Sequence, residues 1–350
     1  MTIGRREFVG GAAAFWLSPF MGCAAGTGGR RPLRFLFMTD HHVESDFVQS
    51  HGLSKGEPVY EMWKPGDHAA LVETYRFINE DVFCRDVDFA LFGGDQLNTG
   101  YAAYPEDMAA ELANYHRTLK ELDVHMRTRG AVADLDFVCE PLANPPVSRV
   151  IALQGNHDTG VREFYRNCAF TAGGVRFIGF FASYVGLPPP PGKRFHSTAK
   201  ISDDTIAFVE KELRSASANP AIRHIVLCSH WAIAPVGENF VNPIVGPCKE
   251  NGMNANRDRL LSVAERYGCR LFINGHEHNG NYPVGMAGKI ADINCGTVTA
   301  EHGGGSFAIV EIDNREARFH VYSRAYVEER DGKVAVIARP RKLFVRKIEI

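Results

Sequence analysis

Several short apolar segments of this chain stop abruptly at Asp, Asn or His residues, and this pattern constrains the fold more than any other feature. Residues 150–154 read as a buried strand and lead into Gly155-Asn156-His157-Asp158, where the glycine permits a tight turn. Asn offers a neutral oxygen ligand, His a group that titrates near neutral pH, and Asp a carboxylate that can orient the histidine. Polar residues also follow the apolar runs at residues 33–38, 87–92, 224–228 and 270–273.

Helical patterns separate these predicted strands. Apolar residues at helical spacing mark residues 71–82 and 105–129, and Ser202 is placed to cap a further helix. The end of the chain alternates in the manner of strands at residues 307–312, 319–322 and 343–350. Strands that alternate with helices predict an α/β fold in layers, and the carboxyl ends of its strands face one crevice.

The overall composition is that of an ordinary globular protein. The chain has 350 residues, of which 45% are apolar and 23% charged, enough for one large domain or two small ones. Lys and Arg total 39 against 41 Asp and Glu, and no run of basic residues stands out. A nucleic-acid-binding surface is therefore not expected, because neutralising phosphates needs a basic patch. The sequence carries no signal for an oligomeric state.

The first residues have the features of an export signal. Residues 2–9, which contain Arg5-Arg6, resemble a twin-arginine signal, and a short apolar stretch follows. That stretch is too short and too rich in Gly and Ala to span a bilayer as a stable anchor. We therefore expect residues 1–31 to be an export signal and tether, residues 32–350 to form one domain, and the protein to reach the bacterial periplasm or cell envelope.

The eight cysteines fall into two groups. Residues 20–23 resemble a bacterial lipoprotein cleavage site, so a lipid anchor on Cys23 and simple cleavage nearby are both open. The remaining seven would normally suggest disulfides in an exported protein, but their number is odd. Cys228, Cys269 and Cys295 lie within or beside apolar runs, and we expect them to be buried thiols.

Five predicted strand ends carry candidate metal ligands. These are Asp40 and His42, Asp95, Asn156 and His157, His230, and His276 and His278. Imidazoles combined with carboxylates and an amide oxygen suit Zn, Fe or Mn. The set is too large for one tetrahedral ion, but it suits two ions that share a carboxylate bridge.

The motifs, taken in order, resemble those of the calcineurin-like metallophosphoesterase family. They are Asp40-x-His42, Gly94-Asp95, Gly155-Asn156-His157-Asp158, Ser229-His230 and Gly275-His276-x-His278, and they span roughly residues 33–312. The resemblance implies a four-layer α/β/β/α sandwich of two mixed β-sheets flanked by helices. It also implies hydrolysis of a small phosphate ester by a hydroxide that two metal ions activate.

The resemblance assigns a role to each motif residue. One divalent or trivalent ion, Mn, Fe or Zn, is expected to bind Asp40, His42 and His278. The other is expected to bind Asn156, His230 and His276, and Asp95 bridges the two. The expected general acid or transition-state stabiliser is His157, which Asp158 supports.

The substrate and the activity leave alternatives open. A phosphomonoester, a phosphodiester and a pyrophosphate all fit the same ligands, and specificity is expected in the loops at residues 43–66, 98–148 and 183–200. A catalytically weak or inactive binding protein at the cell envelope is the main alternative. Degenerate relatives usually lose ligands, however, and every ligand position is present here. A β-lactamase-like metallohydrolase is disfavoured because the His-x-His-x-Asp-His run is absent.

Four residues beside the motifs invite an interpretation. Asn98 stands where the related purple acid phosphatases carry a tyrosine ligand, so a tyrosine-ligated ferric site is not expected. Asn98 is a candidate to contact substrate or to support a ligand. His41 and His302 are expected to be structural, with contact to substrate as the alternative for His41 and a place at the rim of the site as the alternative for His302. Trp231 is expected to pack beside the site.

Overall fold

The computed structural model describes residues 31–43, 67–98, 105–131, 135–140, 148–186, 197–234, 253–278, 280–299, 305–330 and 333–350. The predicted export signal lies outside these ranges except for Arg31, and Cys23 and His302 lie outside them as well. All elements given below belong to the unit Pro32–Ile350.

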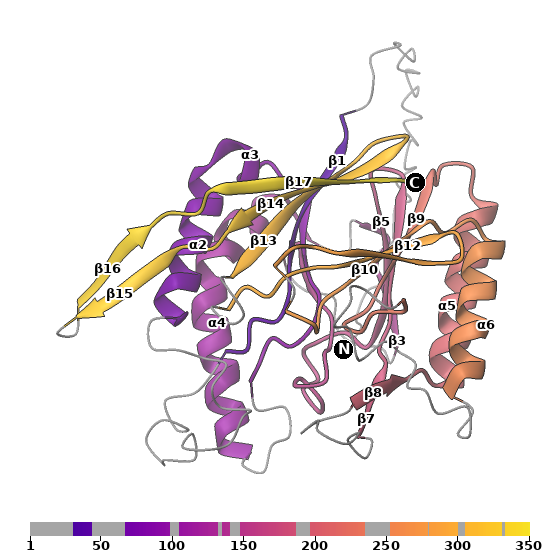
Figure 1. Ribbon diagram of the computed structural model, residues 1–350, viewed down its shortest axis with the longest axis horizontal. Helices are drawn as coiled ribbons and strands as arrows, with labels where there is room; N and C mark the ends of the chain where they lie inside the picture. The colour runs from indigo at the N-terminus through magenta and orange to yellow at the C-terminus, as the bar shows by residue number, and fades with distance from the viewer. Residues whose placement is uncertain are drawn as a thin grey trace, which may run out of the picture. The chain divides into compact units, whose positions relative to one another are not determined.

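A six-stranded mixed sheet contains the first three motif strands (Figure 1). In spatial order its strands are β17 (Lys342–Glu349), β14 (Glu316–Ser323), β13 (Ser306–Ile312), β1 (Leu33–Met38), β2 (Phe89–Phe92) and β4 (Val150–Ala152). Strands β1, β2 and β4 are parallel, and β13 is antiparallel to β1. Because parallel strands end at the same edge of a sheet, the motifs after β1, β2 and β4 lie together.

A seven-stranded mixed sheet contains the two remaining motif strands. In spatial order its strands are β11 (Val284–Ala287), β12 (Ile290–Asn294), β10 (Leu271–Asn274), β9 (His224–Cys228), β6 (Val175–Gly179), β5 (Asn167–Ala172) and β3 (Val138–Glu140). Strands β6, β9, β10 and β12 are parallel. The Ser229-His230 and Gly275-His276 motifs therefore emerge from neighbouring strand ends, after β9 and β10.

Helices cover the outer face of each sheet (Figure 1). The six-stranded sheet packs against α2 (Asp67–Glu80), α3 (Val82–Arg85) and α4 (Pro105–Arg127). The seven-stranded sheet packs against α5 (Asp203–Ala218) and α6 (Met253–Arg266). The predicted cap of α5 is confirmed, because the Ser202 hydroxyl accepts the Thr205 amide at 3.1 Å.

The inner faces of the two sheets meet in an aromatic core. Phe35 stacks on Phe89 with ring centroids 4.9 Å apart, and Phe170 stacks on Phe177 at 5.0 Å. Phe89 also meets Phe177 edge to face at 5.1 Å, which joins the two sheets. Each ring is at most 1% exposed, and burying one contributes about 1.5–3 kcal/mol. The predicted α/β fold of two mixed sheets flanked by helices is confirmed.

The structure also contains strands that the sequence does not predict. They are β3, β5, β11 and β12, together with the hairpins β7 (Ser183–Gly186) with β8 (Ser197–Lys200) and β15 (Tyr326–Arg330) with β16 (Lys333–Ala338). Strand β12 is the informative case, because Asp292 and Asn294 interrupt its apolar pattern and yet are fully buried. Hydrogen bonds to residues distant in the sequence offset part of the cost of removing these polar groups from water.

The cysteines in the described part of the chain are buried and form no disulfide with one another. This confirms the prediction for Cys228, Cys269 and Cys295. Burial raises the pKa of Cys269 to about 12, so this thiol stays protonated and unreactive at neutral pH. Of the helices that the structure describes, none is long and apolar enough to cross a membrane.

Candidate metal centre

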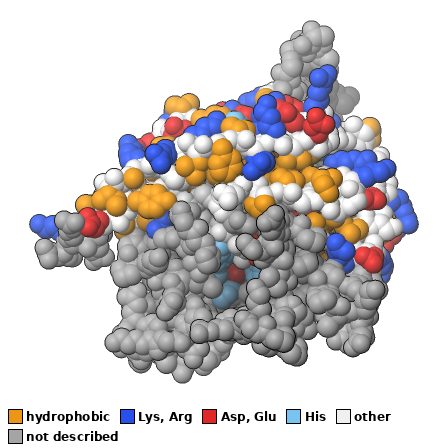
Figure 2. All heavy atoms as spheres, in the orientation of Figure 1, with side chains coloured by type: hydrophobic (Ala, Val, Ile, Leu, Met, Phe, Trp, Pro, Cys, Tyr) orange, Lys and Arg blue, Asp and Glu red, His pale blue; other side chains and the backbone are white. Residues whose placement is uncertain are grey.

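The motif turns are tied to one another by backbone hydrogen bonds. The amides of Asp40 and His42 donate to the carbonyl oxygens of Gly94 and Asp95, each at 3.0 Å. From the other sheet, the amide of His276 donates to the Asp40 carboxylate, 3.0 Å from Oδ2. Figure 2 shows histidine and acidic side chains lying together in a hollow on this face of the protein. The five strand ends therefore form one site.

The first group of candidate ligands comprises Asp40, His42 and His278. Nε2 of His278 lies 3.1 Å from Oδ1 of Asp40 and 3.0 Å from Nε2 of His42. The three side chains are buried, and their ligand atoms lie within 4.8 Å of one another. Two imidazole nitrogens and a carboxylate oxygen that face one point are a ligand set for Zn, Fe or Mn.

The second group comprises Asp95, His230 and His276. Nε2 of His230 lies 3.0 Å from Oδ2 of Asp95 and 3.2 Å from Nδ1 of His276. Nδ1 of His230 lies 3.1 Å from the carbonyl oxygen of Gly93, which can accept its proton. Such a bond fixes the tautomer of a ligating histidine and leaves Nε2 free for the metal.

Asp95 stands between the two groups. Its Oδ2 lies 3.0 Å from Nε2 of His230, 3.9 Å from Nε2 of His42 and 4.0 Å from Nε2 of His157. Its Oδ1 accepts the amide of His157 at 2.8 Å. One carboxylate oxygen therefore faces imidazoles from both groups while the other anchors the Gly155 turn. This is the arrangement that a bridging carboxylate requires.

Asn156 supplies the amide oxygen that the sequence predicts as a ligand. The residue is 3% exposed, and its Oδ1 has no hydrogen-bond partner among the described residues. A buried acceptor left unpaired costs about 1–3 kcal/mol, and a cation beside it would remove that cost. Together with the nitrogen and oxygen ligands of both groups, this unpaired atom fits a centre for two metal ions.

The backbone at the candidate ligands is strained. Left-handed φ values occur at Asp40 (55°), His42 (45°), Asp95 (51°), His276 (73°) and His278 (51°). Among the described residues other than glycine, the same conformation occurs elsewhere at Asp136 and Tyr282. It costs an L-residue about 1–2 kcal/mol, and such strain concentrates at functional sites. The backbone thus marks the same residues as the side-chain chemistry does.

Two motif glycines allow the turns to approach one another. A Cβ at Gly155 would lie 2.1 Å from Oδ1 of Asp95. A Cβ at Gly275 would lie 2.1 Å from Oγ1 of Thr39 and 2.5 Å from Oδ2 of Asp40. The Thr39 hydroxyl donates to that same Asp40 oxygen at 2.6 Å, so it helps to orient the carboxylate. Only glycine fits at either position without moving a candidate ligand or its partner.

Burial and neighbouring charge set the protonation of the site. Burial lowers the pKa of His276 to about 3, which leaves a neutral ring with a lone pair for a metal. Burial also acts to lower the pKa of His230, but Asp95 and Asp40 outweigh it and raise that pKa to about 9. For Asp40 and Asp95, burial acts to raise the pKa, and the nearby histidines outweigh it and hold both below the usual range. A metal ion would take the place of the proton on His230.

His157 and Asp158 are supported in a way that differs from the expectation. Nδ1 of His157 lies 2.5 Å from the carbonyl oxygen of Asn98, which orients the ring. The Asp158 carboxylate accepts the amides of Gly155 at 2.9 Å, Leu97 at 3.0 Å and Gln96 at 3.2 Å. It therefore joins the Gly155 turn to the segment after Asp95. The support that Asp158 gives His157 runs through the backbone.

Three residues beside the motifs contact or adjoin the site. Trp231 is fully buried as predicted, and its ring centroid lies 3.7 Å from that of His276. His41 is also buried and packs against Phe92 with ring centroids 4.6 Å apart, and neither of its ring nitrogens has a hydrogen-bond partner among the described residues. The Asn98 side chain is buried, and neither Nδ2 nor Oδ1 has a hydrogen-bond partner among the described residues.

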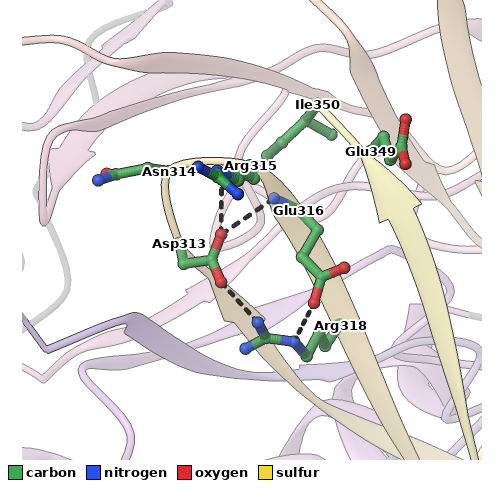
Figure 3. Close-up of a pocket in the computed structure, with 7 residues that line it drawn as sticks. All are labelled: Asp313, Asn314, Arg315, Glu316, Arg318, Glu349 and Ile350. Carbon is green, nitrogen blue, oxygen red and sulfur yellow. Dashed lines mark hydrogen bonds and ion pairs between the residues drawn. The ribbon is translucent and has the colours of Figure 1, made fainter.

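A separate pocket of about 750 Å³ lies at the opposite edge of the six-stranded sheet (Figure 3). Ile312 pairs with Leu33 at the start of β1, so the β13–β14 turn that lines this pocket lies far from the end of β1. Two of its acidic groups pair with Arg318, Asp313 at 2.6 Å and Glu316 as well. None of the predicted site residues lines it, so it is not the candidate centre.

The family of the chain follows from a sequence comparison. The model of the calcineurin-like phosphoesterase family matches residues 33–280, which is most of the chain. This protein therefore belongs to the calcineurin-like phosphoesterase family. Metal-dependent hydrolysis of phosphoesters is the activity consistent with that family. No curated protein sequence gives a significant match.

The solved structures that match this chain include two vacuolar sorting proteins and one sulfate thiohydrolase. Vps29 from Cryptosporidium parvum is 13% identical, with 91% of this chain and 98% of that chain covered and a TM-score of 0.31. Vps29 from Chaetomium thermophilum is 9% identical, with 91% of this chain and 97% of that chain covered and a TM-score of 0.34. Sulfate thiohydrolase SoxB from Thermus thermophilus, solved with glycerol, is 14% identical with a TM-score of 0.35, and 91% of this chain aligns with 56% of SoxB.

Proposed function

We propose that this protein hydrolyses a small phosphomonoester or phosphodiester at a centre for two metal ions. The observation that carries the proposal is the pair of ligand groups, Asp40, His42 and His278 on one side and Asp95, His230 and His276 on the other, which face each other across Asp95. Membership of the calcineurin-like phosphoesterase family supports the same reaction class.

The ligands divide between the two ions as the motifs suggest. One ion would be held by Asp40, His42 and His278. The other would be held by His230, His276 and the unpaired amide oxygen of Asn156, with Asp95 shared between them. Two such ions, when bound, polarise the phosphoryl oxygens and supply hydroxide as the nucleophile near neutral pH.

His157 is the proposed proton donor. Because Nδ1 points at the carbonyl oxygen of Asn98, the neutral ring carries its proton there and presents Nε2 toward Asp95, 4.0 Å away. Burial lowers the pKa of His157 to about 4, so the ring is neutral before substrate binds. An anionic phosphoryl group beside the ring favours the imidazolium form, so the ring takes up a proton from solvent at Nε2 when substrate binds and then donates that proton to the leaving oxygen.

Asn98 is the proposed contact to the substrate. Its carbonyl holds His157, and its side-chain amide has a donor and an acceptor without partners among the described residues. A buried amide with an unused Nδ2 donor can bind a phosphoryl oxygen next to the proton donor. This role replaces the tyrosine ligand of the related phosphatases with a hydrogen-bond donor.

The test is hydrolysis of p-nitrophenyl phosphate and of its bis-ester by protein reconstituted with Mn, Fe or Zn. We expect turnover of at least one ester, a fall of about 10²–10⁴-fold for His157→Ala, and loss of metal as well as activity for Asp95→Ala. The control is His116→Ala, since His116 is half-exposed on α4 and pairs with Glu163. Wild-type protein that binds two metal ions but hydrolyses neither these nor other phosphoesters would contradict the proposal and favour the binding-protein alternative.

We also propose that the protein is exported to the periplasm or cell envelope. The support is the sequence alone, with Arg5-Arg6 before a short apolar stretch and Cys23 at its end. Replacing both arginines by lysine is expected to leave the protein in the cytoplasmic fraction. If Cys23 is lipidated, Cys23→Ser moves the exported protein from the membrane to the soluble fraction, and an unchanged distribution in both variants would contradict export by this signal and anchoring by this residue.

A further inference from the structure

Strand β12 carries a carboxylate that belongs to neither ligand group. Asp292 is fully buried, and its Oδ2 accepts two backbone amides, from Ile233 at 2.7 Å and from Ala234 at 2.6 Å. These amides follow His230 by three and four residues in the segment after β9. One oxygen of Asp292 therefore holds the chain just beyond a candidate ligand.

The other oxygen of Asp292 is connected, through two asparagine side chains, to the turn that carries His276. Asp292 Oδ1 accepts a hydrogen bond from Nδ2 of Asn274, the last residue of β10. The Asn274 Oδ1 accepts from Nδ2 of Asn294 at 2.6 Å, and that amide also donates to the carbonyl of Gly275. The relay thus ends at the residue before His276.

The direction of every bond in this relay is fixed by its ends. The amides of Ile233 and Ala234 can only donate, and the carbonyl of Gly275 can only accept. Because Nδ2 of Asn294 donates to that carbonyl and to Oδ1 of Asn274, Asn274 must present its Nδ2 group to Asp292. Residue 292 must therefore accept on both of its oxygens, which a carboxylate does and an asparagine does not. An NH₂ group there would face another donor in a buried place.

The segment after His230 is also held from α6. Nε of Arg257 donates to the carbonyl oxygen of Ile233 at 2.8 Å. The peptide groups at Ile233 are therefore bound on both sides, by a cation at the carbonyl and by Asp292 at the amide. A direct bond from the amide of Gly275 to the carbonyl of His230, at 3.0 Å, completes the connection between the two turns.

We propose that Asp292 is a positioning residue that fixes His230 and His276 at the separation needed to bind one metal ion together with Asp95. The inference rests on the metal centre proposed above and adds a residue that no motif contains. The relay holds both turns that carry this group. Of the other group it reaches only the turn of His278, whereas Asp40 and His42 are also held by backbone bonds to Gly94 and Asp95 after β2. Loss of the relay is therefore expected to weaken the site of His230 and His276 more than the other site.

The test compares Asp292→Asn with the wild type by titration with Mn²⁺ and by electron paramagnetic resonance. Wild-type protein is expected to bind two ions and to give the spectrum of a spin-coupled pair. In Asp292→Asn we expect the affinity for the ion at His230 and His276 to fall about 10–100-fold and the affinity for the other ion to fall much less, so that one equivalent gives an isolated-ion spectrum. The matched control is Asp313→Asn, whose carboxylate accepts two amides and an arginine at the far edge of the sheet.

Several outcomes would overturn the inference. One is a folded Asp292→Asn variant that binds both ions with wild-type affinity. Another is a variant that loses the same factor of affinity at both sites. Should that variant not fold, Asn294→Ala breaks the relay at its other end and is expected to weaken the same site, while unchanged binding would refute the proposal. Wild-type protein that binds two ions without hydrolysing phosphoesters would contradict the proposed function alone, and the spectra of the variants would still test the role of Asp292.

Discussion

Gly155→Ala is expected to damage the metal centre through a steric clash alone. The φ of Gly155 lies outside the left-handed region, so an alanine can adopt its backbone conformation. The added Cβ, however, would lie 2.1 Å from Oδ1 of Asp95 and 2.3 Å from its backbone nitrogen. A clash with backbone cannot be relieved by a rotamer change. The turn that carries the bridging carboxylate has to move.

The size of that movement sets the expected effect. Real Cβ contacts are essentially never shorter than 3.0 Å, so a starting distance of 2.1 Å requires a shift of about 0.9 Å, the difference between the two. Misplacing a reacting group by about 1 Å costs about 10²-fold in rate, which corresponds to about 2.7 kcal/mol. Overpacking should also lower the free energy of unfolding, by about 1–3 kcal/mol.

Gly160→Ala is the matched control for this prediction. Gly160 has a φ of +94°, and a Cβ added there meets nothing within 4 Å. The control should lose about 1–2 kcal/mol of unfolding free energy from backbone strain and keep its metal affinity and kcat/KM. Both variants would be measured by Mn²⁺ titration, hydrolysis of bis-p-nitrophenyl phosphate and urea unfolding without metal. Wild-type metal binding and activity in Gly155→Ala, or equal losses in both variants, would refute the reasoning.

Three further predictions concern the core, a helix cap and the metal. Phe177→Ala should lower the free energy of unfolding in urea by about 3–5 kcal/mol, because the ring is buried between the sheets, and a loss under 1 kcal/mol would contradict that packing. Ser202→Ala should cost about 0.5–2 kcal/mol in the same assay through loss of the α5 cap, with no change in metal binding. Removing metal with a chelator should abolish hydrolysis, and metal at 100 times its Kd should raise the free energy of unfolding by about 2.7 kcal/mol; a thermal midpoint that does not respond to metal would count against the centre.

The sequence predicts the strands that carry motifs better than it predicts the others. Strands β1 and β9 are apolar runs with a sharp polar end, and local periodicity is enough to find them. Strand β12 is hidden because its buried Asp292 carboxylate and the Nδ2 group of its buried Asn294 form hydrogen bonds with residues far away in the chain. Strand β5 could have been found, since Gly173-Gly174, with φ of 55° and 81°, is a hairpin signal before β6.

The sequence also predicts some features of the candidate site and not others. The identities of the ligands can be read from the motifs because the chemistry requires Asp, Asn and His at strand ends. The orientation of the histidine rings cannot be read from the motifs, because backbone carbonyl groups fix it. The carbonyl of Gly93 holds His230, and the carbonyl of Asn98 holds His157. Every residue has a carbonyl group, so no residue type signals these contacts. The role of Asp158 differs from the expectation for the same reason, since its partners are amides.

The strained turns and the hydrogen bonds between them have one physical explanation. A left-handed residue at Asp40 or Asp95 turns the chain sharply at the strand end. Each such turn is unfavourable alone, but the amides it exposes bond to the next turn, as from Asp40 to Gly94. The ligand positions are thereby fixed by backbone contacts before any metal binds. Preorganisation of this kind reduces the ordering cost of binding, and Asp292 adds a second connection between the turns of His230 and His276.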